Sequence, residues 1–153
     1  MLTKKILQQN YTLNRKFYQL KLPFDIDCII PENDSVRLLS QFVEEMDLTR
    51  LYSTYFRIRE NQVPPMNMLK IMLYGYMNGL YSSRDIETAC RRDINFMFLL
   101  EGASPPDHST FARFRSLHFA PCAEKILTEV TNFLYKIGEI SGESIFIDGT
   151  KIE

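Results

Sequence analysis

The chain has 153 residues, of which 45% are hydrophobic and 24% are charged. These values are typical of a globular protein with one domain, or with one domain and a fragment of a second, and they exclude a low-complexity chain. The formal net charge of −1 neither requires nor excludes a nucleic-acid partner. The sequence shows no visible signal peptide and no apolar run as long as a membrane span, which favours a cytoplasmic protein.

Residues 1–24 are polar and basic, and we expect them to form a poorly ordered arm. Their charged residues are all cations, namely Lys4, Lys5, Arg15, Lys16 and Lys21. After Pro31, Asp34 or Ser35 can cap a helix by accepting a hydrogen bond from a backbone amide. Apolar residues then recur at helical spacing: Val36, Leu38, Leu39, Phe42, Val43 and Met46. Asp47 begins a further short helical segment.

The most apolar segment of the chain is MNMLKIMLYGYMNGLYSS. Its hydrophobic residues lie almost all round a helix, which predicts the central buried helix of the fold. Gly75 indicates the close approach of a neighbouring element, and Gly79 marks the C-terminal end of this helix. Ser82 or Ser83 can cap the next helix, in which Glu87 is predicted to close a capping box.

A short apolar helix then ends at Gly102, and two further helices follow it. The first, FARFRSLHF, is predicted to be compact and to be capped by Asp107 or Ser109. The second begins near Pro121 and runs as an amphipathic helix of about five turns to Gly138.

The predicted fold class is therefore all-α, with a multi-helix bundle over residues 32–138 in which helix-turn-helix-like elements are one arrangement. Only the closing segment ESIFIDGTKIE has the pattern of a β-strand. Asp148 follows this strand and Gly149 follows Asp148, an arrangement that can hold a carboxylate rigidly for a divalent metal. Acids after strands also commonly cap turns, and a metal site needs further ligands.

Five arginines form a candidate binding group on two predicted helices: Arg84, Arg91 and Arg92 on one, and Arg113 and Arg115 on the other. Arg84 and Arg91 are seven residues apart and share a helix face. We expect Arg113 and Arg115 to point toward solvent, which would suit a DNA-binding bundle. The alternative is an ordinary solvated surface, because Asp85 and Asp93 are neighbours of these arginines.

The other polar clusters predict no chemistry of their own. Asp107, His108 and Ser109 are adjacent, whereas a catalytic triad needs side chains that converge from different elements. Three widely spaced cysteines indicate reduced thiols rather than a disulfide frame or a zinc site: Cys28, Cys90 and Cys122.

Four segments together resemble bacterial insertion-sequence transposases of the DDE type with an InsH-like N-terminal domain. They are LPFDIDCIIPENDSVRLLSQFVEEMDLTRLY, PPMNMLKIMLYGYMNGLYSSRDIETACRRDINFMFLLEG, PPDHSTFARFR and SGESIFIDGTKIE. The resemblance covers residues 20–153 in the order and spacing of the family. It implies a helical N-terminal domain at 25–140, after the arm, and the first strand of a ribonuclease-H-like catalytic domain at 141–153.

The resemblance assigns Asp148 the role of first metal-binding carboxylate of a catalytic triad. In the family a second Asp and a Glu, much further along, complete the site and bind two Mg²⁺ ions that promote phosphoryl transfer. The 153 residues end before those partners, so we expect no nuclease or strand-transfer activity from them alone and no bound metal. The chain would then be a truncated transposase, either a remnant or the first half of a split or frameshifted reading frame.

The resemblance also implies that the helical domain contributes to binding the terminal repeats of the element during transposition and to self-association. The five arginines are then expected to contact DNA phosphates. Two alternatives stay open. The chain could be a protein-interaction module that dimerises with, or inhibits, full-length transposase without binding DNA, or it could be an inert remnant.

Overall fold

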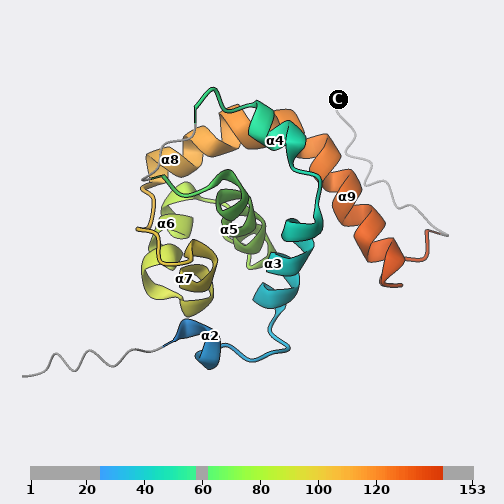
Figure 1. Cartoon of the computed structure of the whole chain (residues 1–153), viewed down its shortest axis with the longest axis horizontal. Coiled ribbons are helices and arrows are strands. Elements are labelled where there is room, and N and C mark those ends of the chain that lie inside the picture. The colour runs from blue at the N-terminus through green and yellow to red at the C-terminus, as the bar shows by residue number, and fades with distance from the viewer. Residues whose placement is uncertain (1–24, 58–61, 143–153) are drawn as a thin grey trace, which may run out of the picture.

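Helices account for all the regular structure in the parts of the chain that the computed structural model describes, residues 25–57 and 62–142. Figure 1 shows their arrangement, which confirms the all-α class. The helices are α2 (Ile26–Ile29), α3 (Ser35–Glu45), α4 (Thr49–Ser53), α5 (Pro65–Met77), α6 (Ser83–Arg92), α7 (Ile94–Leu100), α8 (His108–Arg113), the π-helical η2 (Phe114–Phe119), the 3-10 helix η3 (Ala120–Cys122) and α9 (Ala123–Lys136). The predicted N-terminal arm, the C-terminal strand and Asp148 lie outside the described residues.

Polar side chains cap the helices where the sequence predicts. The carboxylate of Asp34 accepts from the backbone N–H of Val36 at 2.9 Å at the start of α3. Ser82 begins α6 through an analogous 3.3 Å bond, and Asp107 begins α8 by accepting from the N–H of Thr110 at 2.7 Å. Each cap satisfies an amide that has no partner within its own helix.

The predicted capping box at Glu87 is wrong. A capping box needs its acid three residues after the cap, and Glu87 lies five residues after Ser82. The side chain instead reaches α8, where its Oε2 atom accepts from the backbone N–H of His108 at 3.0 Å. Glu87 therefore ties the start of α8 to the middle of α6.

Helix α5 runs through the centre of the bundle and contacts α3, α6 and α7, as its apolar sequence predicts (Figure 1). A Cβ atom on Gly75 would lie 3.2 Å from Cγ1 of Ile86, which confirms a close approach there, by α6. Gly79 has a φ of +73° and allows Leu80 to donate back to the carbonyl of Gly75 at 2.8 Å. The helix ends at this left-handed turn, as predicted.

The two predicted helices around Pro121 form one uninterrupted helical run from α8 through η2 and η3 to α9, which corrects the expected break (Figure 1). Pro121 has no N–H to donate, and the chain passes it by changing helical pitch, with π-helical turns before it and a 3-10 turn around it. The run ends where Gly138 adopts a φ of +80°, again as predicted.

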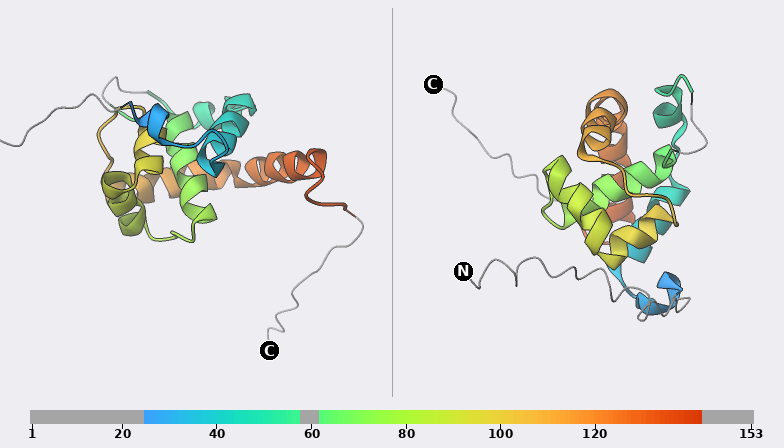
Figure 2. Two further views of the ribbon diagram at one scale, coloured as in Figure 1. Left: turned by 90° about the horizontal axis from the view of Figure 1, so that it is seen from below. Right: turned by 90° about the vertical axis from the view of Figure 1, so that its left-hand side faces the viewer.

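The core lies between α5 and the helices around it, and apart from the buried Lys70 and Asn67 its most buried members are apolar. They include Val36, Val43, Leu69, Ile71, Met72, Ile86, Cys90, Phe96, Leu99, Phe111 and Phe114. Helix α9 contacts α3 through the rings of Phe42 and Phe133, whose centroids are 4.5 Å apart, and its C-terminal half extends beyond the bundle (Figure 2). None of the described helices combines the length and apolarity that a membrane crossing needs.

Candidate nucleic-acid interface

The predicted arginine group divides between two helices that pack against each other, α6 and the run formed by α8 and η2. On α6, Ile86 and Cys90 are 0% exposed and fix which face of the helix points inward. Arg84, Arg91 and Arg92 consequently lie at exposed positions. On α8, the buried ring of Phe111 has the same effect and leaves Arg113 exposed.

Arg91 belongs to a polar cluster at the junction of α6 and α8. One of its guanidinium nitrogens lies 2.9 Å from Oε1 of Glu87, and Nδ1 of His108 lies 3.0 Å from Oε2 of the same carboxylate. The hydrogen bond from the His108 side chain is the largest cause that holds the pKa of Glu87 below its ordinary value, and Arg91 lowers this pKa further. Arg91 is thus both exposed and partly neutralised.

Arg115 is half-buried, which corrects the expectation that it points to solvent. Its guanidinium donates to the backbone carbonyl of Tyr81 at 2.6 Å and lies 5.7 Å from the ring centroid of Tyr76. Its Nε atom is buried without a hydrogen-bond partner among the described residues. Arg115 follows the buried Phe111 by four residues, and residues four apart share a helix face, so Arg115 lies beside the buried face rather than opposite it.

The guanidinium groups of the remaining three arginines, Arg84, Arg92 and Arg113, have no hydrogen-bond or ion-pair partner in the part of the chain that the structure describes, and we call these residues the unpaired arginines. Asp93, the acid next to Arg92, accepts from the N–H of Asn95 at 2.8 Å and so caps α7. The unpaired arginines therefore present their full charge to solvent, where a phosphate can approach them.

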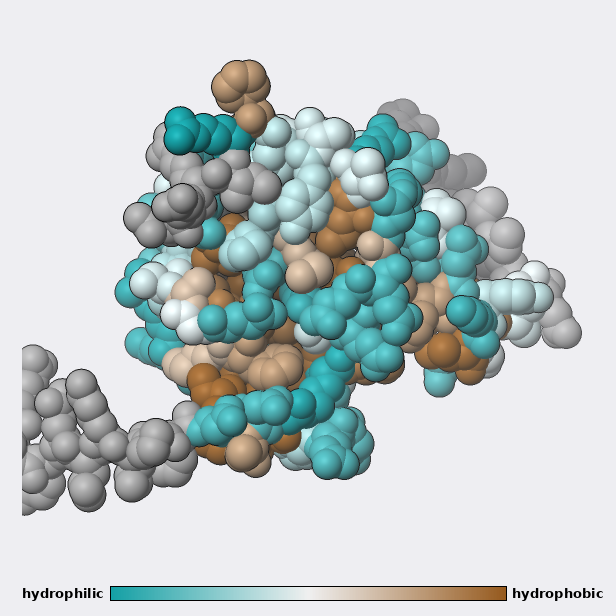
Figure 3. All heavy atoms as spheres, in the orientation of Figure 1, coloured by the Kyte–Doolittle hydropathy of each residue, from teal (hydrophilic) through white to brown (hydrophobic). Residues whose placement is uncertain are grey.

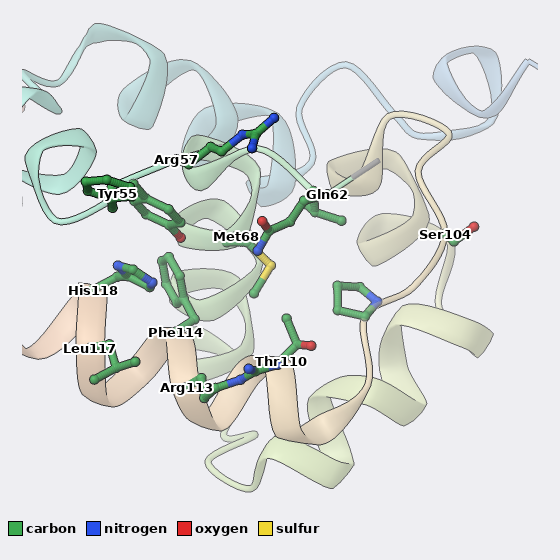
Figure 4. A pocket seen from close by; sticks show the side chains of 13 residues that line it. Tyr55, Arg57, Gln62, Met68, Ser104, Thr110, Arg113, Phe114, Leu117 and His118 are labelled. Carbon is green, nitrogen blue, oxygen red and sulfur yellow. The ribbon is translucent and has the colours of Figure 1, made fainter. Parts of the chain in front are cut away.

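A groove of about 1200 Å³ lies beside Arg113, between η2 and the chain segments before and after residues 58–61. Figure 4 shows Arg57 on the wall opposite Arg113. The sequence analysis did not select Arg57 as a candidate, and the two aromatic residues directly before it, Tyr55 and Phe56, were the available signal.

The inner end of the groove is built by aromatic rings. His118 stacks on Tyr55 with ring centroids 3.7 Å apart, and its Nδ1 atom lies 2.8 Å from Oγ1 of Thr54. Burial lowers the pKa of His118 below its ordinary value of 6.5, and burial raises the pKa of Tyr55 to about 12. Both rings are therefore neutral near pH 7.

The described residues contain no group of three or more His, Cys, Asp or Glu side chains that could hold a metal ion. Cys28 is exposed, Cys90 and Cys122 are buried, and all three are unpaired thiols. Burial raises the pKa of Cys90 to about 12, so its thiol is protonated at neutral pH. Asp148, the predicted metal-binding carboxylate, lies outside the described residues.

Comparison with protein families matches residues 24–117 to a family described as a transposase domain (DUF772). Neither a curated protein nor a solved structure matches the chain. The matched region is more than half of the chain and extends from α2 into η2, so it contains α6, α8 and all five arginines of the candidate group. The chain therefore belongs to the transposase domain family.

Proposed function

We propose that the helical bundle contributes to DNA binding in transposition, by contacting the terminal DNA of an insertion sequence through the unpaired arginines. The observation that supports this proposal is the placement of Arg84, Arg92 and Arg113 on two helices that pack together in a chain of a transposase family. Their guanidinium groups have no partner among the described residues. Guanidinium groups bind phosphate oxygens strongly because their planar N–H groups match the phosphate geometry.

The five candidate arginines have different roles in this proposal. The unpaired arginines contact phosphates directly. Arg91 contributes less, because Glu87 already accepts one of its N–H groups. Arg115 holds the turn at Tyr81 against η2 and positions the two helices rather than touching DNA. Phosphate contacts of this kind provide affinity and orientation without reading base sequence.

Salt-dependent binding tests the proposal. A fluorescent duplex with the terminal repeats is titrated with the intact chain at several salt concentrations. The variant Arg84→Ala, Arg92→Ala, Arg113→Ala is expected to bind more weakly and to reduce the slope of log affinity against log salt by about 2 to 3, since each lost phosphate contact removes about 0.9. Arg50→Ala is the matched control, because Arg50 is exposed on α4. An unchanged slope in the triple variant rejects the proposal.

A second candidate function is a protein-interaction module that pairs with a full-length InsH-like transposase without touching DNA. Helix α9 supports it, because Leu127, Tyr135 and Ile137 are 66%, 61% and 48% exposed. Figure 3 shows hydrophobic side chains near the end of α9. Sedimentation velocity of the chain with and without Leu127→Glu tests this candidate, and a monomer in both cases, with no co-purifying relative, rejects it.

A further inference from the structure

The groove beside Arg113 lies between side chains of two separate parts of the chain (Figure 4). Residues 55–57, Gln62 and Val63 form one wall, and Thr110, Arg113, Phe114 and Leu117 of α8 and η2 form the other. Its volume of about 1200 Å³ exceeds the 300–1000 Å³ that is typical of small-molecule pockets. An extended chain therefore suits this groove better than a compact ligand.

The charge of the groove favours an anionic occupant. Among the described residues of its lining, Arg57 and Arg113 are cations and none is Asp or Glu, although the whole chain has 19 acidic residues against 18 Lys and Arg. Among the described residues, neither guanidinium group has a hydrogen-bond or ion-pair partner. His118 adds no charge near neutral pH, because its burial lowers its pKa. The two arginines thus supply a positive potential that no acid among the described lining residues cancels.

The aromatic residues of the groove favour an unpaired base over a duplex. Phe56 is fully exposed, at a relative exposure of 107%, immediately before Arg57. Proteins that bind single strands combine a basic groove with aromatic rings on which bases stack. In a duplex both faces of each base are already covered by its neighbours, so an exposed phenyl ring finds no partner unless it kinks the helix.

We infer that this groove binds a short single strand of DNA, with Arg57 and Arg113 contacting phosphates from opposite walls and Phe56 stacking on a base. The inference goes beyond the proposed function, which concerns duplex DNA and the exposed arginines of α6 and α8. Arg113 lies at the border between the two surfaces, so a strand leaving the groove meets the duplex-binding face.

Binding of a fluorescent oligothymidine and of a sequence-matched duplex to the intact chain tests this inference. Phe56→Ala and Arg57→Ala are each expected to weaken oligothymidine binding at least about fivefold, the lower range for loss of one stacked base. Both are expected to leave duplex affinity and thermal stability unchanged, since both side chains are exposed. Arg50→Ala is expected to change neither oligothymidine affinity nor duplex affinity. The double variant Arg84→Ala, Arg92→Ala is expected to weaken duplex binding alone.

A tryptophan reporter provides a direct test of stacking, because the chain contains no Trp. In Phe56→Trp the indole fluorescence is expected to be quenched by oligothymidine at the concentrations that saturate binding. Absence of quenching at saturation overturns the stacking role. Two results overturn the single-strand site. The first is an oligothymidine affinity within twofold of wild type in both alanine variants, and the second is an equal loss of affinity for single strand and duplex. Either result leaves the proposal of duplex binding by the unpaired arginines intact.

Discussion

Lys70 offers the sharpest test of the packing described above, because its charged side chain is fully buried in α5. Its Nζ atom donates to Oε1 of Glu44 at 2.6 Å and lies 3.5 Å from Oε1 of Glu101. The two carboxylate side chains are 52% and 60% exposed, whereas the lysine side chain is 0% exposed. Removing a carboxylate should therefore have a different effect from removing the ammonium.

Glu44→Ala leaves the buried ammonium of Lys70 with only the longer, 3.5 Å contact to Glu101 as an ion pair. Breaking a buried pair usually costs about 3–5 kcal/mol. Glu101 remains near, and Glu44 is half exposed, so we expect a smaller loss of about 2–3 kcal/mol, close to that of a hydrogen bond to a charged group. Lys70→Met removes the buried charge itself and leaves two carboxylates that water can solvate. Its stability is expected within about 1 kcal/mol of wild type.

Urea unfolding followed by circular dichroism measures these differences. At a slope of about 2 kcal/mol per M, Glu44→Ala should lower the midpoint by about 1–1.5 M. Glu45→Ala is the matched control, because Glu45 is exposed and bonds only Gln41 within the described chain. A Lys70→Met variant as unstable as Glu44→Ala would refute the reasoning, since it would show that the buried ammonium contributes net stability.

Acid unfolding examines the same pair. The hydrogen bond from Lys70 lowers the pKa of Glu44 below its ordinary value of 4.5. The pair therefore stabilises the fold above pH 4.5, and this contribution is lost as the pH falls through the lower folded pKa. Lys70→Met should remove this part of the pH dependence.

Two further predictions concern α6 and the groove. Gly75→Val should destabilise the fold by about 1–3 kcal/mol in thermal unfolding, because a Cβ atom at this position would already lie 3.2 Å from Ile86 and valine adds two methyl groups to it. An unchanged melting temperature would contradict the packing of α5 on α6. Burial lowers the pKa of His118 in the folded state, so as the pH decreases the unfolded state binds a proton on this side chain before the folded state does. The free energy of unfolding should therefore fall as the pH decreases from 6.5. His118→Gln should show a shallower decrease in urea titrations between pH 7 and 5, and an identical slope would exclude His118 as its source.

Helix boundaries were predictable from the sequence because the bonds that set them are local. Asp34 and Asp107 accept from amides two or three residues away, and Gly79 and Gly138 provide the left-handed conformation that ends a helix. The central position of α5 followed from its apolar residues alone. The continuous helical run through Pro121 could not be predicted in this way, because a proline ordinarily marks a helix start, and here π-helical turns accommodate it.

The sequence alone thus determined the all-α class, most helix ends and the family resemblance, since each depends on residues that are close along the chain or on an ordered set of segments. Tertiary structure decided which charges face solvent. It pairs Glu87 with His108, buries Lys70 and turns Arg115 toward Tyr81. It also brings Arg57 and Arg113 to one groove. Such contacts depend on how helices pack at long sequence separation, and no local pattern specifies that packing.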